Sequence, residues 1–281
     1  MRTAALTAAA LVGFAANSLL CRMALGPRRV DAATFTSIRI VSGAVTLFLL
    51  ARLAAPPREA AATAAGSWAS AVALFAYAAA FSFAYLRIGA GVGAVLLFGA
   101  VQATMLAWGL RRGERPGRAE WVGLTAALAG LVALVRPGLS APDPAGAVLM
   151  IAAGIAWGAY SLRGRGATRP LAATASNFAR AVPLAGALSI GLLGSAHADL
   201  RGALLAATSG ALTSGVGYSL WYAALAGLTS TQAAVVQLSV PVLAAAGGVA
   251  LLGEMLTPRL VACGGIILGG VALAVLGRRK S

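Results

Sequence analysis

The chain is poor in charged residues, and this scarcity bounds its fold class. Only 10% of the 281 residues are charged, whereas 60% are hydrophobic and the mean hydropathy is +0.87. Soluble domains usually carry about a quarter charged residues. The composition therefore excludes a water-soluble fold, which would need far more polar surface than this chain can supply.

Three further scarcities exclude particular kinds of chemistry. Lys280, in the C-terminal tail, is the only lysine, so the chain lacks the lysine of a phosphate-binding P-loop and ATP is not its energy source. His197 is the only histidine, and the pattern predicts that it lies in a solvated loop. Cys21 and Cys263 fall in or beside apolar runs, where we expect small buried thiols rather than a disulfide or metal pair. We expect no metal and no cofactor, because hydrolytic metal sites need clustered ligands.

Acidic residues are also few, and none falls in the middle of an apolar run. The seven are Asp31, Glu59, Glu114, Glu120, Asp143, Asp199 and Glu254. Proton- and sodium-coupled carriers commonly use a carboxylate deep in the bilayer. The sequence therefore predicts weak or indirect ion coupling, with facilitated exchange or export down a gradient.

Long apolar runs fill most of the chain. Their lengths are near the ~20 residues that cross a ~30 Å hydrocarbon core, and lipid requires every backbone polar group to be satisfied within the segment. The alternation of a barrel strand is absent. We therefore expect an all-α integral membrane protein with ten transmembrane helices, at 4–25, 31–53, 66–86, 89–110, 119–136, 145–162, 170–193, 201–225, 229–252 and 258–277.

Basic residues concentrate in the breaks between these runs. The formal charge of +15 is not read as a nucleic-acid footprint, because loops of membrane proteins collect arginine and lysine. With the N-terminus inside, thirteen basic residues fall on the cytoplasmic side and seven outside. This excess predicts an inner-membrane protein with both termini in the cytoplasm.

The two halves of the chain resemble each other. Gly113-Glu114 and Gly253-Glu254 are 140 residues apart, and Arg39 and Arg180 are 141 apart. We interpret residues 1–138 and 145–281 as two five-helix repeats. Because five is odd, the second repeat enters the membrane upside down, and inverted repeats are typical of secondary transporters.

Several stretches also resemble a known family, the EamA type of the drug/metabolite transporter superfamily. The residues that carry this resemblance are Gly13 to Ser18, Arg39 with Gly43, Ala153 to Tyr160, Ala223 to Pro241, and Gly253-Glu254. The first repeat departs from the pattern, since Val101 stands where the second has Pro241. The resemblance implies movement of small metabolites, often export of amino acids or related compounds.

Polar and aromatic side chains inside the spans are the candidates for substrate binding. Arg39 costs about 3 kcal/mol at a helix centre, so it should face the interior, bound either to a substrate carboxylate or to helix carbonyls. For Arg180 the structural role is favoured, because Pro183 can free a carbonyl for it. Aromatic residues at i, i+4 spacing, as in Tyr218 and Tyr222, share one helix face and suit a planar or apolar solute. The predicted substrate-binding residues are Asn17, Arg39, Tyr77, Phe81, Phe98, Gln102, Trp157, Tyr218, Tyr222 and Gln237.

Other residues are assigned to packing or anchoring. Tyr85 and Trp108, near span ends, are expected to anchor the helices at the membrane interface. Two glycine pairs, Gly154-x-x-x-Gly158 and Gly265-x-x-x-Gly269, are expected to let helices approach closely.

These features favour a secondary transporter that exports amino acids or related compounds by alternating access. A multidrug or cationic-compound exporter is the alternative, and a channel or membrane-embedded enzyme is more remote, since such an enzyme needs clustered acids or histidines at one interface. The expected partners are a small-molecule substrate and the lipid bilayer. Nucleic acid is not an expected partner, and association into a homo-oligomer, the direction of transport and the coupling ion stay open.

Overall fold

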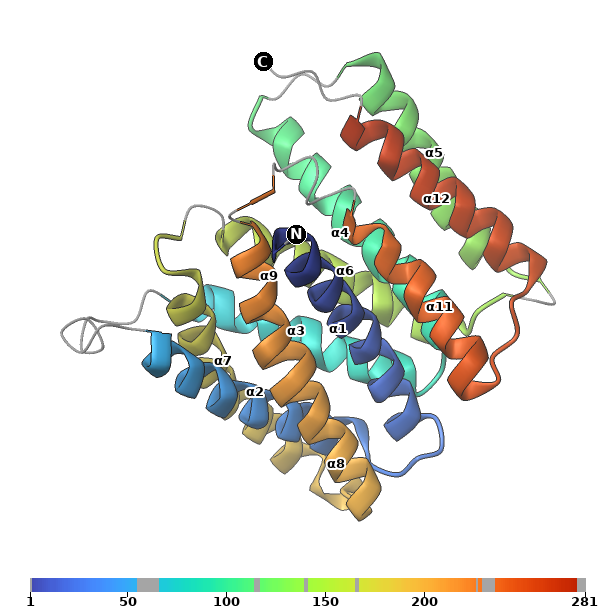
Figure 1. Cartoon of the computed structure of the whole chain (residues 1–281). Coiled ribbons are helices and arrows are strands. Elements are labelled where there is room, and N and C mark those ends of the chain that lie inside the picture. Colours follow the sequence, from blue (N-terminus) through green and yellow to red (C-terminus); the bar gives the residue numbers. More distant parts are fainter. Residues whose placement is uncertain are drawn as a thin grey trace.

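The computed structural model is built of helices. It describes residues 2–54, 66–113, 117–138, 141–164, 167–225, 227–228 and 236–276. In chain order the helices are α1 (Arg2–Leu25), α2 (Ala32–Ala54), α3 (Trp68–Tyr85), α4 (Ala90–Arg111), α5 (Arg118–Val135), α6 (Pro144–Gly164), α7 (Pro170–Gly191), η1 (Leu193–Ser195), α8 (Leu200–Thr208), η2 (Ser209–Val216), α9 (Gly217–Leu225), α11 (Ser239–Leu252) and α12 (Pro258–Leu276). Figure 1 shows the long helices running side by side through one bundle.

One expected span is a composite rod. Helices α8, η2 and α9 follow one another without a break, and η2 is a π-helical segment of 8 residues. Counting this rod once, the described residues form ten long helical segments at the positions that the apolar runs predict. In the segment expected at 229–252, α11 begins at Ser239, and residues 229–235 lie outside the described part of the chain.

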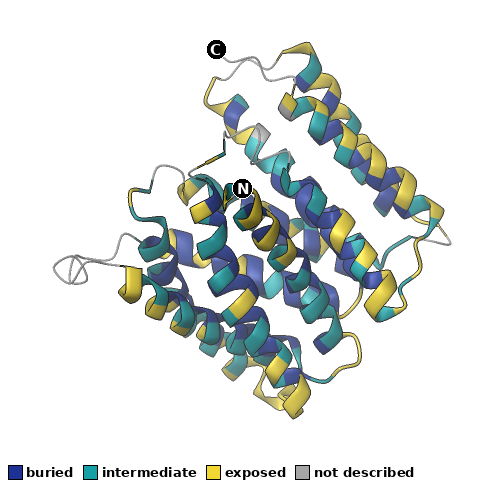
Figure 2. Cartoon of the chain, viewed as in Figure 1, coloured by how far each residue is buried: buried dark blue, intermediate teal, exposed yellow. Residues whose placement is uncertain are grey.

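The outer surface of the bundle is apolar. Helices α1 to α6 are each long and apolar enough to cross a membrane, and α11 and residues 258–274 are shorter apolar helices. Large hydrophobic side chains such as Val45, Phe48, Val148 and Ile155 are half exposed on this surface, as the exposed outer faces in Figure 2 illustrate. Exposed hydrophobic side chains on helices of this length fit a lipid environment.

Two groups of helices form the centre of the bundle. In the first, α6 packs against both α3 and α4, and we call this the α3–α4–α6 group. In the second, α1 packs against both α9 and α11, and we call this the α1–α9–α11 group. Helices α2 and α7 pack together, and α5 and α12 form a pair to one side of the bundle (Figure 1).

Close helix approach depends on one of the two expected glycine pairs. A methyl group on Gly154 of α6 would stand 2.6 Å from the carbonyl oxygen of Leu97, so α4 and α6 meet backbone to backbone there. The expectation for Gly265 and Gly269 was wrong, since no atom of a neighbouring helix in the described part of the chain lies within 4 Å of where their side chains would stand. The spacing identifies a shared helix face but not which face meets a neighbour. On α12 the contact with α5 is instead made by Gly270.

The expectation that Tyr85 anchors at the membrane interface was also wrong. Its side chain is fully buried, its ring packs edge-on against Phe81 at 4.7 Å, and its hydroxyl donates to the carbonyl of Ala90 at 3.4 Å. Tyr85 ends α3 inside the bundle, so nearness to a helix end did not bring it to the lipid boundary. Trp108, by contrast, is 43% exposed, and the guanidinium of Arg112 lies over its ring.

A central cavity as the candidate binding site

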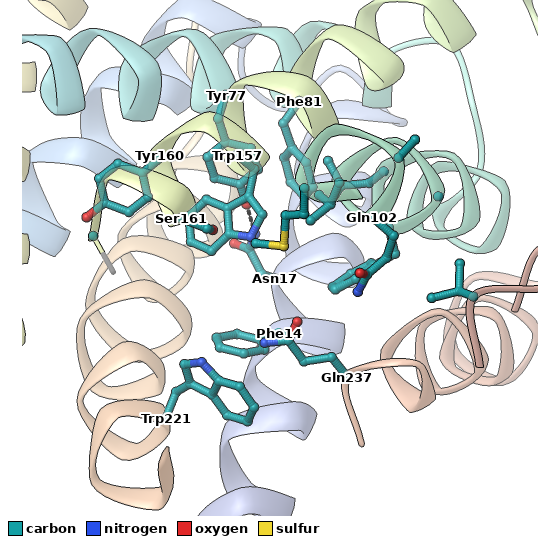
Figure 3. A pocket seen from close by; sticks show the side chains of 18 of the residues that line it. Phe14, Asn17, Tyr77, Phe81, Gln102, Trp157, Tyr160, Ser161, Trp221 and Gln237 are labelled. Atoms are coloured by element: carbon teal, nitrogen blue, oxygen red, sulfur yellow. Dashed lines mark hydrogen bonds between the residues drawn. The ribbon is translucent and has the colours of Figure 1, made fainter. Parts of the chain in front are cut away.

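A cavity of about 660 Å³ lies between the two groups of helices. Side chains of α1, η2 and α9 form one wall, and side chains of α3, α4 and α6 form the facing wall, while α5 and α12 complete the lining. This volume is in the range of small-molecule sites. Figure 3 shows Tyr77, Trp157 and Asn17 converging near the centre of the cavity, with Phe14 and Trp221 close by.

The structure brings together nine of the ten residues singled out from the sequence. The nine that line this one cavity are Asn17, Tyr77, Phe81, Phe98, Gln102, Trp157, Tyr218, Tyr222 and Gln237. Eight of them come from five different helices and Gln237 from the residues just before α11, so the sequence alone could not show that they share a site. The tenth, Arg39, is not part of the lining and lies behind Tyr77 and Phe81.

An aromatic cluster forms the middle of the cavity. The ring of Trp157 stacks on Tyr218 at 5.3 Å and lies 4.8 Å from Tyr77 and 5.4 Å from Tyr160. Because these four rings come from α3, α6 and α9, the cluster spans both groups of helices. Such a surface offers large apolar faces with hydroxyl groups at their edges, which suits a planar or apolar solute.

Sequence reasoning missed several lining residues, including Phe14, Tyr160 and Trp221. Each lies three positions from a predicted residue on the same helix: Phe14 from Asn17, Tyr160 from Trp157, and Trp221 from Tyr218. Residues three apart share a helix face. Extending the predicted faces by one turn would have found all three.

A polar layer crosses the cavity beside the aromatic cluster. The side-chain oxygen of Asn17 accepts hydrogen bonds from Ser209 at 2.7 Å and from Thr213 at 3.0 Å, and its NH₂ group lies 3.5 Å from the hydroxyl of Tyr77. Ser209 and Thr213 belong to the π-helical segment η2. Wide turns of this kind recur at functional sites, and here η2 bonds to Asn17 of α1, which in turn reaches Tyr77 of α3.

Arg39 is buried directly behind this layer. Its side chain is 2% exposed, its Nη2 donates to the Tyr77 hydroxyl at 3.0 Å, and its Nε donates to Ser214 at 3.4 Å. The guanidinium lies 5.2 Å and 5.1 Å from the ring centres of Tyr77 and Phe81. Within the described residues, Nη1 has no hydrogen-bond partner. Arginine stays charged in proteins, so this is a buried cation with incomplete pairing.

Arg180 has a different environment. Its Nη1 is bonded to the side chain of Ser176, one turn earlier on α7, and lies 3.4 Å from the carbonyl of the same residue. Arg180 does not line the cavity. The structural role expected for it fits these contacts, although the carbonyl it approaches is not one that Pro183 frees.

The cavity runs to one end of the bundle. Its lining includes Glu120 at the start of α5, Ser161 near the end of α6, and Leu225 at the end of α9. This is the end at which α1 begins and α12 finishes (Figure 1). We call it the open end. Glu120 there accepts a hydrogen bond from the backbone N–H of Gly117 at 2.7 Å and so caps α5.

At the opposite end of the bundle, which we call the closed end, the lining of the cavity stops short of a charged contact that we call the Arg22–Glu254 latch. Both carboxylate oxygens of Glu254 accept from the backbone N–H of Ala90, at 2.9 Å and 2.8 Å. Arg22 lies 3.4 Å from the same carboxylate and donates to the carbonyl of Tyr85 at 2.8 Å. The carboxylate faces the N-terminus of α4, where helix geometry favours negative charge. The latch thus joins the ends of α1 and α11 to the turn between α3 and α4.

Two loops meet at the same closed end, and we call residues 26–31 and 196–199 the loop pair. Val30 forms an isolated antiparallel bridge with Ala198, and Arg29 pairs with Asp199 at 3.1 Å. The backbone N–H of Asp31 donates to the carbonyl of His197 at 3.0 Å. These contacts tie the α1–α2 connection to the start of α8.

The acids and thiols of the described residues agree with the sequence prediction. The acids Asp31, Glu120, Asp143, Asp199 and Glu254 lie in loops or in the first turn of a helix, and Glu59 and Glu114 fall outside the described residues. Cys21 and Cys263 are buried free thiols. No group of three potential metal ligands occurs in the part of the chain that the structure describes.

Comparison with known proteins identifies the family. Residues 144–276 match the EamA-like transporter family. The whole chain is 52% identical over 277 residues to the "Uncharacterized protein PA1977" of Pseudomonas aeruginosa, covering 99% of this chain and 96% of the relative. The chain belongs to the EamA-like transporter family. With its apolar helices, this EamA-like chain is a multi-pass membrane protein of a transporter family.

The fold of this EamA-like chain also has a counterpart among solved structures. A protein described only as "Crystal structure of protein" superposes with a TM-score of 0.64 over 96% of each chain, at 19% sequence identity. That likeness concerns the fold alone, because fold does not carry function with it.

Proposed function

We propose that this protein is a secondary transporter that moves small metabolites across the inner membrane by alternating access. The observation that carries the proposal is the cavity between two helix groups, which reaches one end of the bundle and is closed at the other. A solute site at the interface of two halves is the recurring arrangement of secondary transporters. Opening the closed end while closing the open end would expose the same site to each side in turn.

We propose further that residues 1–138 and 145–281 are two inverted five-helix repeats. The packing supports this, because contacts recur when each helix is exchanged for its partner five spans later. Helix α3 packs on α6 as α9 packs on α1, and α4 packs on α6 as α11 packs on α1. The pairs α2–α7 and α5–α12 are each made of two corresponding helices. Such an arrangement gives the two groups equivalent roles, which alternating access requires.

The open end is assigned to the cytoplasm. The basic residues of the sequence favour this side, thirteen against seven, with both termini inside. The charged latch and the loop pair then lie on the outside. In this arrangement the cavity receives its solute from the cytoplasm, which supports export as the direction of net transport.

Amino acids or related compounds are the first choice of substrate. The aromatic cluster supports a side chain with an apolar or planar part, and Asn17, Gln102 and Gln237 supply amide groups for polar atoms. Aromatic faces also attract cations, which is the argument for a cationic drug. Against it stands the buried charge of Arg39, whose guanidinium lies directly behind two of those faces.

Counterflow in proteoliposomes tests the proposed function. Purified protein would be reconstituted with unlabelled solute inside, and uptake of the same labelled solute would be followed for amino acids, sugars and cationic drugs. We expect a transient overshoot for at least one amino acid or related carboxylate and none in protein-free vesicles. Overshoot for bulky cations alone would overturn the substrate assignment. Flux that is never stimulated by solute on the opposite side would overturn alternating access in favour of a channel.

A further inference from the structure

The charges around the cavity are unbalanced: a buried cation stands behind its wall without an acidic partner among the described residues. Arg39 carries a full positive charge that is 98% removed from solvent, and no salt bridge among the described residues involves it. Among the described lining residues the one acid is Glu120, at the open end, which caps α5. A buried charge of this kind is costly unless an opposite charge or a full set of hydrogen bonds meets it.

The bonds of Arg39 point its charge toward the cavity. Its Nη2 and Nε donate to the hydroxyls of Tyr77 and Ser214, and both of these residues line the cavity. A hydroxyl that accepts from a guanidinium still has its own O–H to donate. Within the described residues neither hydroxyl donates to an acceptor, and Arg39 Nη1 also lacks a partner. The two hydroxyl protons are therefore left for an acceptor at this point of the wall, and the unpaired Arg39 Nη1 lies buried behind it.

We infer that this wall is an anion subsite, formed by the hydroxyls of Tyr77 and Ser214 with Arg39 behind them, and that the cavity takes a carboxylate attached to a planar or apolar body. The anion accepts from the two hydroxyls, and the guanidinium balances its charge. The aromatic cluster, whose Trp157 ring lies 4.8 Å from Tyr77, receives the apolar part. This inference rests on the proposed function, because it names the class of solute that the same cavity carries.

A purely structural role for Arg39 makes a different prediction. Its hydrogen bonds join α2 to α3 and to η2, so its loss would weaken the bundle whatever the solute. In that case a change at Arg39 alters stability but not the preference for one ligand charge over another. The quantity to measure is therefore the ratio of the affinities for an anionic and a neutral ligand of the same shape.

Three compounds with one ring and chain and different charge provide the probes. They are 3-phenylpropanoate, its neutral amide, and 3-phenylpropylamine, and their binding to the purified full-length protein in detergent is measured by isothermal titration calorimetry. We expect the carboxylate to bind about tenfold or more tightly than the amide, the usual scale for hydrogen bonds to a charged group. The amine should bind more weakly than either. Equal binding of carboxylate and amide, preference for the amine, or no binding of the carboxylate would each overturn the inference.

Variants then test whether the preference for the carboxylate over the amide depends on Arg39. In Arg39→Gln the ratio of carboxylate to amide affinity should fall to near one, and Arg39→Lys should keep part of it. Tyr77→Phe removes the bridging hydroxyl and leaves the arginine in place, and it should also lower the ratio of carboxylate to amide affinity. If Arg39→Gln does not fold, Tyr77→Phe tests the anion subsite in its place. Arg180→Gln is the matched control, because Arg180 is bonded within its own helix and does not line the cavity. A wild-type ratio in the folded Arg39 or Tyr77 variants would overturn the assignment.

The experiment separates this inference from the proposed function. Binding is measured without transport, so a carboxylate preference in a protein that shows no counterflow would refute the transporter and leave the anion subsite standing. Counterflow that is equal for the carboxylate and its amide would refute the subsite and leave the transporter standing.

Discussion

At the scale of single residues, His197 links the loop pair to pH. Its ring nitrogens lie 3.1 Å from two backbone carbonyl oxygens, Nδ1 from that of Ser195 and Nε2 from that of Arg28. A neutral imidazole can donate to only one of them, so these carbonyls raise the pKa of His197 above 6.5. For Asp31, burial raises the pKa, but hydrogen bonds from Thr34 and from the His197 and Ala33 backbone lower it by more, so that the net pKa lies below its usual value. Asp31 therefore stays ionised in this pH range.

We expect the loop pair to hold more tightly at pH 6 than at pH 8. The second hydrogen bond of the imidazolium is fully present below pH 6.5 and is lost as the pH rises through the raised pKa of His197. Hydrogen exchange of the Asp31 and His197 amides, corrected for its intrinsic pH dependence, should show less protection at pH 8. His197→Gln should remove this difference. Equal protection of the wild-type protein at both pH values would contradict the prediction.

Gly248 determines whether Glu254 can reach its partner. A methyl group at Gly248 would stand 2.7 Å from Glu254 Oε2, so Gly248→Ala should push the carboxylate off the Ala90 N–H. We expect a loss of about 1–3 kcal/mol, the usual cost of overpacking. Thermal unfolding in detergent measures it. Gly265→Ala is the control, because no atom of another described helix lies within 4 Å there and alanine favours helix. Equal unfolding temperatures for the two variants would show that the carboxylate moves aside freely.

At the scale of helices, two ion pairs near the closed end have different positions relative to the two helix groups. The Arg22–Glu254 latch joins the α1–α9–α11 group to the turn between α3 and α4. Arg87 and Asp143, 3.6 Å apart, join that same turn to the start of α6 and so lie within the α3–α4–α6 group. The second pair is therefore a matched control for the first.

We expect Glu254→Gln to open the cavity toward the closed end. The amide keeps one acceptor for Ala90 but loses the charge that attracts Arg22 and the N-terminus of α4. The measurement is the reaction of Ser18→Cys, one turn before Arg22 in the cavity lining, with a membrane-impermeant maleimide added outside intact cells. Labelling should be several-fold faster with Glu254→Gln and unchanged with Asp143→Asn. Native Cys21 and Cys263 are buried, which keeps the background low. Equal rates in all three proteins would remove the latch from the closing mechanism.

The helices were predictable from the sequence because lipid leaves an apolar run few alternatives. The π-helical segment η2 was not, because hydropathy does not distinguish its turns from α turns. Its shape depends on tertiary fit, as at Gly215, where a methyl group would stand 2.7 Å from Thr46 of α2. Asn17 and Gln237 were found because amides are rare in such runs. Phe14 and Trp221 were missed because the helix faces of Asn17 and Tyr218 were not extended by one turn.

The latch could not be predicted for a different reason. Arg22 and Glu254 are both found at the ends of apolar runs, where charged residues are ordinary, and 232 positions separate them. Only the packing of α1 against α11 brings them together. Long-range pairs of this kind follow from the tertiary fold, which the periodicity of one segment does not contain.

At the scale of the whole molecule, the placement of acids governs how transport can be driven. The five described acids lie in loops or first helix turns, and of these Glu120 is the one that lines the cavity. We expect counterflow to continue when an uncoupler collapses the proton gradient, and an imposed gradient to produce no accumulation. An absolute requirement for the proton gradient would contradict this. Glu120→Gln would then be the first variant to examine.

The membrane potential, unlike the proton gradient, should drive transport if the solute is an anion. Moving one elementary charge across 100 mV is worth about 2.3 kcal/mol, so an inside-negative potential favours exit of a carboxylate by about 50-fold in its concentration ratio. Export then needs no coupling ion, which agrees with the absence of a mid-span acid among the described residues. In proteoliposomes with a potassium–valinomycin potential, inside-negative vesicles should speed efflux of labelled 3-phenylpropanoate, and reversed potential should slow it. Efflux of the neutral amide should respond to neither, and efflux of the carboxylate that is equally insensitive would mean that its charge crosses the membrane compensated.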